Sequence, residues 1–251
     1  MKRALALLML LLSACPSGGS PVTRPSASPS EPIRILVFTK TAGFKHASIP
    51  AAAAVVKGAL STRAAVDVTA DAASFTDAGL EPYRAVVFLL TTGDVLDREQ
   101  ELAFERFIAK GRGFAGVHSA TDTEYAWPWY HELIGATFKR HPKSQRATVR
   151  IADPSHSSMK VVPSPWVRTD EWYDFRDNPR RRVHVLATVD ESTYSGGTMG
   201  RDHPIEWCRL FGGGHSWYTA MGHGEDSWRD PVFLSHVAQG IVSAALGSPG
   251  C

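Results

Sequence analysis

Apolar and polar positions in residues 33–118 follow an alternation of strands and helices. Short apolar runs rich in β-forming residues at 33–39, 65–69, 83–90 and 113–118 predict four strands. An Ala-rich segment that Pro50 opens, and a segment from Asp97 to Gly111 with apolar side chains at helical spacing, predict helices. Strands that alternate with helices are typical of an α/β fold with a doubly wound, mostly parallel sheet.

The second half of the chain has a less regular pattern. Residues 147–151 and 183–189 resemble strands, and apolar side chains at helical spacing predict a closing helix over 231–246. Tryptophan and histidine are concentrated in segments that the pattern predicts as loops, at 138–142, 170–173, 200–207 and 212–223. No internal repeat is evident, so we expect a single domain over residues 33–247.

The first 32 residues carry a different pattern. Lys2 and Arg3 precede about nine apolar residues, which is typical of a secretory signal and too short for a membrane span of about 20 residues. Residues 12–15, Leu-Ser-Ala-Cys, resemble the lipobox of bacterial lipoproteins, in which the cysteine is acylated; an ordinary signal with an incidental cysteine is the alternative. Residues 16–32 hold twelve Pro, Ser or Gly and predict a flexible tether.

The expected organisation is therefore a signal peptide at 1–14, lipidated Cys15 with a disordered tether over 15–32, and the α/β domain. This arrangement places the protein in the cell envelope, anchored through its lipid to a membrane outside the cytoplasm.

The charge balance bears on binding partners, and the cysteine content bears on disulfide formation. Of 27 Lys and Arg residues, two lie in the predicted signal, and the remaining 25 balance 25 Asp and Glu. This balance leaves no basic footprint, so we expect no nucleic-acid partner. Outside the cytoplasm Cys208 and Cys251 could form a disulfide; a buried free thiol and a frayed terminal cysteine are the alternative.

Polar residues follow three of the predicted strands. In open parallel sheets, ligands bind beyond the carboxyl ends of the strands, so these residues should share one edge. We interpret His118 as a catalytic general acid or base that Asp122 or Glu124 orients, although a structural histidine and a helix cap are the alternatives for His118 and Asp122. Substrate-binding candidates at the same edge are His46, Asp94 and Ser119.

Aromatic residues beside acids and histidines in the later segments suit sugar recognition, because rings stack on a pyranose while carboxylates bind its hydroxyl groups. Each tryptophan could equally belong to a core with paired polar groups. The additional saccharide-binding candidates are Glu171, Trp172, Asp202, His215 and Trp217. The candidate ligands for a divalent metal such as zinc are His118, His141, His203 and His223, although no short His-x-x-x-His motif supports such a site.

Several motifs together resemble the ThuA-like (trehalose-utilisation) family over about residues 33–246. They are Gly-Phe-Lys-His at 43–46, Gly-Val-His-Ser-Ala-Thr-Asp-Thr-Glu-Tyr at 116–125, Trp-Pro-Trp-Tyr at 127–130, Asp-Glu-Trp-Tyr at 170–173, Asp-His-Pro-Ile at 202–205 and Trp-Tyr-Thr-Ala-Met-Gly-His at 217–223. The resemblance implies a flavodoxin-like fold similar to class I glutamine amidotransferases.

Two departures limit what the resemblance implies. Amidotransferases place a nucleophilic cysteine at the turn where this chain has His118 and Ser119, so we do not expect glutamine hydrolysis. Many family members have arginine where this chain has His215. A permanently charged guanidinium is thus replaced by a titratable imidazole. If that arginine binds an anion or a ketone in the family, this chain should take a different substrate.

The resemblance implies a role in the use of trehalose and related disaccharides, including oxidised 3-keto sugars. Our leading expectation is an enzyme, a glycoside-cleaving hydrolase or lyase, in which proton abstraction next to a ketone allows C–O cleavage by elimination. A divalent metal could polarise that ketone. A surface module that binds a saccharide or a partner without turnover is the second hypothesis, and a structural envelope protein with a vestigial polar edge is the third.

Overall fold

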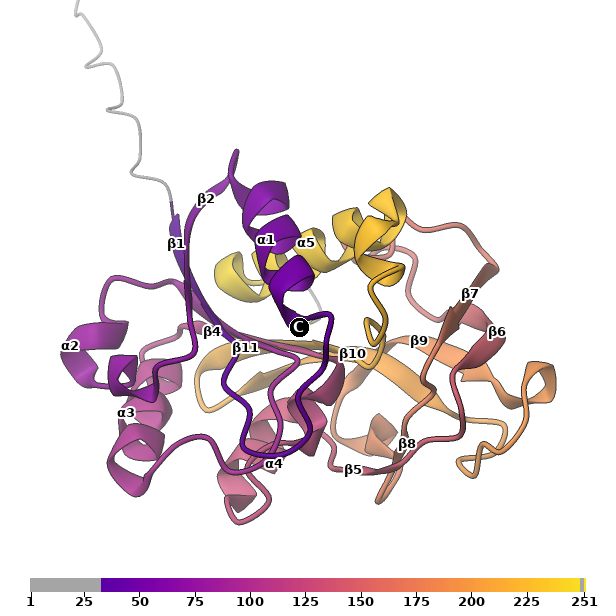
Figure 1. The fold of residues 1–251 in the computed structure, drawn as a ribbon, viewed down its shortest axis with the longest axis horizontal. Coiled ribbons are helices and arrows are strands. Elements are labelled where there is room, and N and C mark those ends of the chain that lie inside the picture. Colours follow the sequence, from indigo (N-terminus) through magenta and orange to yellow (C-terminus); the bar gives the residue numbers. More distant parts are fainter. Residues whose placement is uncertain (1–32, 249–250) are drawn as a thin grey trace, which may run out of the picture. The chain divides into compact units, whose positions relative to one another are not determined.

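A mixed β-sheet forms the centre of the domain in the computed structural model, which describes residues 33–248 and 251 (Figure 1). The predicted signal peptide, Cys15 and the tether lie outside the described residues. In sheet order the strands are β2 (Ala64–Thr69), β1 (Ile33–Phe38), β3 (Ala85–Leu89), β4 (Gly113–Val117), β11 (Gly214–Thr219), β10 (Pro204–Phe211), β9 (His184–Asp190), β6 (Gln145–Ile151) and β7 (Trp166–Asp170).

One half of the sheet is parallel. Strands β2, β1, β3, β4 and β11 all run in the same direction. Every residue of β3 and β4 is buried, which explains why both read as continuous apolar runs rather than as alternating patterns. The predicted α/β fold and its four strands are confirmed.

The other half of the sheet is antiparallel, from β11 through β10, β9 and β6 to β7. The prediction of loops at 204–207 and 214–218 was wrong, because these residues form the β10–β11 hairpin. Gly212 and Gly213 make its two-residue turn with φ angles of 59° and 95°, a backbone conformation that glycine adopts without strain. A small second sheet pairs β5 (Phe138–Arg140) with β8 (Asp174–Phe175).

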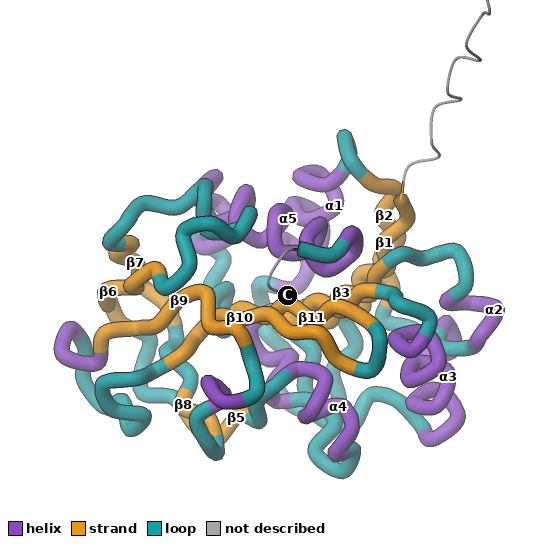
Figure 2. Tube along the Cα trace, turned by 180° about the vertical axis from the view of Figure 1, so that it is seen from behind, coloured by secondary structure: helices purple, strands orange, loops and turns teal. Residues whose placement is uncertain are grey.

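Helices cover both faces of the sheet. Figures 1 and 2 show α1 (Ile49–Leu60) and α5 (Pro231–Leu246) on one face, with α3 (Arg98–Ala109) and α4 (Pro128–Ile134) on the other. Short α2 (Asp77–Leu80) packs beside α3. The predicted helix start at Asp97 is a capping box, in which its side chain accepts from Gln100 N while the Gln100 side chain accepts from Asp97 N. Single 3₁₀ turns occur at Ala72–Ser74, His118–Asp122, Pro179–Arg181, Glu191–Thr193 and Ser227–Arg229.

A disulfide joins Cys208 in β10 to Cys251. The carbonyl oxygen of Cys251 accepts a hydrogen bond of 2.8 Å from Nδ1 of His215, at the start of β11. Of the two arrangements that the sequence left open for these cysteines, the structure contains the pair. Among the described residues, no helix is both long enough and apolar enough to cross a bilayer.

Candidate functional site

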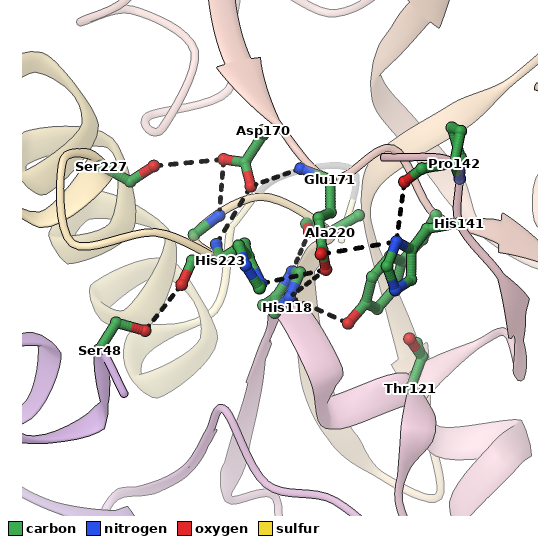
Figure 3. Close-up of polar contacts among 12 residues, drawn as sticks. Ser48, His118, Thr121, His141, Pro142, Asp170, Glu171, Ala220, His223 and Ser227 are labelled. Atoms are coloured by element: carbon green, nitrogen blue, oxygen red, sulfur yellow. Dashed lines mark hydrogen bonds and ion pairs between the residues drawn. The ribbon is translucent and has the colours of Figure 1, made fainter. Parts of the chain in front are cut away.

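Three histidines and one glutamate converge at the carboxyl end of the parallel strands. His46 lies in the loop after β1, His118 directly follows β4, Glu171 directly follows β7, and His223 lies in the loop after β11 (Figure 3). Each offers one nitrogen or oxygen atom, and these four atoms all lie within 4.8 Å of one another. The strand ends therefore bring together side chains that are up to 177 residues apart in the chain.

His118 is held in one orientation by its two ring nitrogens. Its Nδ1 lies 2.7 Å from the carbonyl oxygen of Ala220, which can only accept, so Nδ1 carries the hydrogen. Nε2 is then the unprotonated nitrogen of the neutral ring and lies 2.9 Å from the hydroxyl group of Tyr173. The side chain is fully buried, and its backbone φ of 54° puts it in the left-handed region as the chain leaves β4.

His46 adds a buried nitrogen without a hydrogen bond. Only 5% of the residue is exposed, and its ring packs edge-on against His118 and His223 at centroid distances of 4.9 and 5.3 Å. Its Nδ1 has no hydrogen-bond partner among the described residues. Burial, followed by the neighbouring His118 and His223, lowers the pKa of His46 to about 3, so at neutral pH its ring is uncharged and its lone pair is free.

Glu171 supplies the negative charge of the group. Its Oε2 lies 3.0 Å from Nδ1 of His223 and 3.6 Å from Nε2 of His118, and its Oε1 lies 3.5 Å from Nδ1 of His141. Burial alone would raise the pKa of Glu171, but its close contacts with His118 and His223 outweigh burial and hold the pKa well below its usual range. The contact with Glu171 in turn raises the pKa of His223 against the opposing effect of burial.

A buried carboxylate fixes the loop that carries His223. Asp170 accepts from the backbone nitrogens of Gly222 at 2.9 Å and His223 at 3.1 Å, and from the hydroxyl of Ser227 at 3.3 Å (Figure 3). The guanidinium of Arg168 lies 3.4 Å from the same carboxylate and is itself almost fully buried. Since Asp170 directly precedes Glu171, this network fixes two members of the cluster at once.

A cavity of about 400 Å³ opens over the cluster. Its lining combines aromatic rings with titratable groups: Phe44, His46, Asp122, Phe138, His141, Glu171, Tyr173 and His223. Burial raises the pKa of Asp122, although a hydrogen bond from the hydroxyl of Tyr125 opposes the shift. The volume falls in the range of roughly 300–1,000 Å³ that is usual for small-molecule sites.

The four-residue cluster fits a divalent metal such as zinc. Imidazole nitrogens and one carboxylate are the donors that zinc prefers. The buried Nδ1 of His46 is a donor without a partner, and the Ala220 carbonyl orients His118 in the way that second-shell groups orient metal-binding histidines. Of the histidines predicted as ligands, His118 and His223 belong to the cluster and His141 lines the cavity.

His203 lies outside this cluster. Its Nε2 is 2.8 Å from the carbonyl oxygen of Tyr173, and its Nδ1 is 2.8 Å from Glu191. Although Asp174 lies near enough to complete a second group of possible ligands, Asp174 accepts hydrogen bonds from Thr198, and Glu191 accepts one from Met199 N. We interpret Asp174, Glu191 and His203 as a structural hydrogen-bonding group that fixes the backbone of Tyr173.

Several predicted site residues lie away from the cavity. Glu124 accepts hydrogen bonds from the backbone nitrogens of Val95 and Leu96, at 2.9 and 2.8 Å, so its carboxylate holds a loop instead of orienting His118. Asp94 accepts from Tyr125 N. Ser119 is fully buried behind the strand end.

The remaining predicted residues lie farther along the sheet. Trp172 is buried and donates to the carbonyl of Gln145, and Asp202 forms an exposed ion pair with Arg180. His215 is at the start of β11, opposite the strand end that leads to His223, and Trp217 packs in the core beside Gly240. These contacts give all four residues structural partners.

Four residues of the site were not singled out from the sequence: Phe44, Phe138, Tyr173 and Asp170. All four lie within segments that were noted for histidine or glutamate, so their position beside those residues was the available signal. The sequence could not show the particular role of Asp170, because this role depends on the distant loop at 222–227.

Comparisons with known proteins agree with this architecture. The family model ThuA, described as trehalose utilisation, matches residues 34–244. A ThuA-like protein from Bacteroides uniformis has a similar structure with 21% identity, a TM-score of 0.71, and coverage of 87% of this chain and 94% of that one. A ThuA-like protein from Parabacteroides merdae is 20% identical with a TM-score of 0.71, over 87% of this chain and 91% of that one.

A β-galactosidase from Rahnella sp. R3 is 16% identical with a TM-score of 0.53, over 83% of this chain and only 31% of the enzyme, which shows a likeness of fold alone. No curated protein matches the chain. Because the family model covers most of its length, the chain belongs to the ThuA family.

Proposed function

We propose that the protein is an enzyme that cleaves a glycoside or keto-glycoside with the help of a divalent metal ion. The observation that carries this proposal is the cluster of His46, His118, Glu171 and His223 beneath an aromatic-walled cavity. The family description, trehalose utilisation, favours a saccharide as the substrate.

The four cluster residues would hold the metal. When bound, a zinc-type ion supplies Lewis-acid polarisation of a carbonyl oxygen or activation of water. His46 and Glu171 suit this role at neutral pH, because the low pKa of His46 keeps its ring uncharged and the low pKa of Glu171 keeps its carboxylate ionised. His223, whose pKa Glu171 raises, would have to release any proton on its binding nitrogen when the metal binds. His118 would bind through Nε2, since its Nδ1 faces the Ala220 carbonyl. The Tyr173 hydroxyl, which donates to that Nε2 here, would turn toward the substrate.

Proton transfer falls to side chains around the cluster. Asp122 lines the cavity, and its raised pKa lets it retain a proton to higher pH than an ordinary aspartate, which suits a general acid. His141 lies on the same cavity and contacts Glu171, so it is placed to accept a proton. We assign the acid to Asp122 and the base to His141, leaving His118 as a ligand.

Metal content tests the first part of this proposal. The protein, purified without chelator or a metal-affinity tag, should contain about one equivalent of zinc or another divalent ion. His46→Ala and His118→Ala should lose it, whereas His184→Ala, which removes an exposed histidine paired with Asp153, should keep it. A folded protein that never retains a divalent ion would contradict the assignment.

Turnover tests the second part. Incubation with glycosides and their 3-keto derivatives should release free sugar, and Asp122→Asn should lower kcat by roughly 10²–10⁴-fold. Stoichiometric binding of a saccharide without any product would instead favour the non-catalytic binding module.

We also propose that the protein is exported and anchored to a membrane by a lipid on Cys15. The lipobox-like residues 12–15 carry this proposal, and the Cys208–Cys251 disulfide supports it, since disulfides persist mainly outside the cytoplasm. Cells fed labelled palmitate should label the wild-type protein in the membrane fraction. Cys15→Ser should remove both the label and the membrane association, and unchanged labelling would contradict the proposal.

A further inference from the structure

A further group of possible metal ligands lies at the disulfide, away from the cluster described above. It consists of Cys208 in β10, Cys251, and His156 in the segment between β6 and β7. The two sulfur atoms and one ring nitrogen of His156 all lie within 4.8 Å of one another. All three residues are buried, with exposed fractions of 1%, 6% and 3% in that order. The fold thus brings sulfur and nitrogen donors of the kind that zinc prefers to one buried place.

His156 keeps one ring nitrogen free of hydrogen bonds. The hydroxyl of Ser158 donates to Oε1 of Glu206 at 3.1 Å, since a carboxylate oxygen accepts. The same hydroxyl oxygen lies 2.8 Å from Nδ1 of His156, so it accepts there and Nδ1 carries the hydrogen. The backbone nitrogen of Ser158 also faces Nδ1, but at 3.3 Å it makes the weaker contact. Nε2 is then unprotonated, and it is buried with no hydrogen-bond partner among the described residues.

The surroundings of His156 resemble those of histidines that bind metals. In such histidines the nitrogen that faces away from the metal commonly donates to a carboxylate, a carbonyl or water, which orients the ring and makes the binding nitrogen more basic. Here Ser158 connects that nitrogen to Glu206, which is fully buried in β10 two residues before Cys208. These contacts fix the ring and leave Nε2 available to a ligand.

The disulfide prevents this group from binding metal as it stands. Zinc binds thiolates, and the sulfur atoms of a disulfide carry no negative charge. Tetrahedral zinc, with Zn–S of about 2.3 Å and Zn–N of about 2.0–2.1 Å, holds such donors roughly 3.5–3.8 Å apart. Because the three donors already lie within 4.8 Å of one another, small movements after the S–S bond opens would bring them into this geometry.

We propose that Cys208, Cys251 and His156 form a zinc site in the dithiol form of the protein, independent of the metal cluster in the proposed function. A dithiol reductant opens the disulfide by exchange, so that the protein gains two thiols and the reductant becomes a disulfide. Zinc then binds as both thiols release their protons. Two thiolates and one imidazole are a known zinc donor set, with water in the fourth position, and the group has three members among the described residues.

The zinc site would replace the crosslink that reduction removes. In the disulfide form a covalent bond ties Cys251 to β10, and in the dithiol form zinc would tie the same two residues together and add His156. Ligands that bind only the folded state stabilise it. Reduction should therefore lower the melting temperature of the protein, and zinc should recover part of this loss.

The experiment compares the zinc content of the full-length protein before and after reduction. One sample is reduced anaerobically with a phosphine and freed of it; both samples then receive zinc and are desalted. The reduced sample should hold about one equivalent more than the disulfide form. With cobalt(II) in place of zinc, the reduced sample alone should show a sulfur-to-metal charge-transfer band, which imidazole and carboxylate ligands cannot produce.

Variants test the part that the histidine plays. His156→Asn keeps a polar atom near the position of Nδ1 and removes Nε2, so it should lower the zinc affinity of the reduced protein by about tenfold or more. Ser158→Ala removes the connection to Glu206 without removing a ligand, and should lower the affinity by about 10–100-fold even if His156→Asn does not fold. His184→Ala, which removes an exposed imidazole, is the matched control and should bind zinc as wild type does.

Two outcomes overturn the proposal. Reduced wild type that takes up no additional zinc and shows no charge-transfer band has no such site. Equal zinc affinities of reduced wild type, His156→Asn and Ser158→Ala would show that the two thiols bind zinc without the histidine. A disulfide form that holds no metal would instead contradict the proposed function, and the difference between the two forms would still test this site.

Discussion

Two buried ionisable side chains, His46 and Glu124, have opposite effects on how the stability of the fold changes with pH between about 4.5 and 6.5. The pKa of His46 is lowered to about 3 and that of Glu124 is raised to about 7, in both cases mainly by burial. His46 therefore takes up a proton more readily in the unfolded chain, and Glu124 more readily in the folded one. Their effects on the pH dependence of stability have opposite signs in this interval.

Replacing His46 should remove one of these effects. Stability from an uncharged His46 is fully present above about pH 6.5, its unfolded pKa, and is lost as pH falls toward 3, at up to about 1.4 kcal/mol per pH unit. In the presence of chelator, the free energy of unfolding of His46→Gln, measured by urea titration at several pH values, should fall less steeply with decreasing pH than that of wild type. An unchanged slope of free energy against pH would mean that His46 does not titrate as a buried, neutral ring.

Replacing Glu124 should have the reverse effect. Stability from its protonated form is present below about pH 4.5 and is lost as pH rises through 7. Glu124→Gln keeps an oxygen that can accept from Val95 N and Leu96 N, so at pH 8 it should unfold at higher urea than wild type. Equal midpoints at pH 8 would show that the ionised carboxylate is tolerated without cost.

At the scale of elements, contact between α5 and β11 depends on one helical glycine. A Cβ atom on Gly240 would lie 2.2–2.5 Å from three ring atoms of Trp217, closer than any real contact. Gly240→Ala should lower the free energy of unfolding by about 1–3 kcal/mol through overpacking, although alanine is the better helix former.

Gly58 provides the matched comparison, since it lies in α1 with nothing within 4 Å of an added Cβ. Gly58→Ala should raise the free energy of unfolding by up to about 1 kcal/mol. The two changes are chemically identical, so denaturant unfolding of both separates helix propensity from packing. Stabilisation by both would contradict the tight contact with Trp217.

The elements that could be predicted from the sequence are those with a regular pattern. Strands β1 to β4 and helices α1, α3 and α5 have apolar runs or helical spacing and flanking signals such as Asp97. The β10–β11 hairpin could not be recognised, because β10 is buried over five successive residues and its aromatic and polar residues do not alternate. Gly212-Gly213 was the one local signal.

The candidate site was predictable only in part for the same reason. His46 and His118 follow strands that the pattern identifies, so their shared edge could be expected. Glu171 and His223 were noted, but their meeting with His118 depends on β11 pairing with β4 and on Asp170 fixing the loop after β11. These contacts join residues that are 102 and 53 positions apart in the chain, and no local pattern encodes them.

At the scale of the whole molecule, the Cys208–Cys251 disulfide lies far from the cluster of His46, His118, Glu171 and His223. Cys251 contacts the start of β11 through His215, while the cluster lies beyond the other end of that strand. Cys208→Ala with Cys251→Ala should lower the free energy of unfolding by about 2–4 kcal/mol and leave metal content unchanged. Loss of metal from this folded double variant would contradict the separation of the two regions.

The left-handed backbone at His118 has an evolutionary consequence. Glycine and asparagine occupy a φ of 54° at lower backbone cost than histidine, so the imidazole has to bring contacts or chemistry that offset this cost. In descendants that abandon the chemistry, His118→Gly or His118→Asn should be among the first changes to spread, and this position would then mark which relatives are still active.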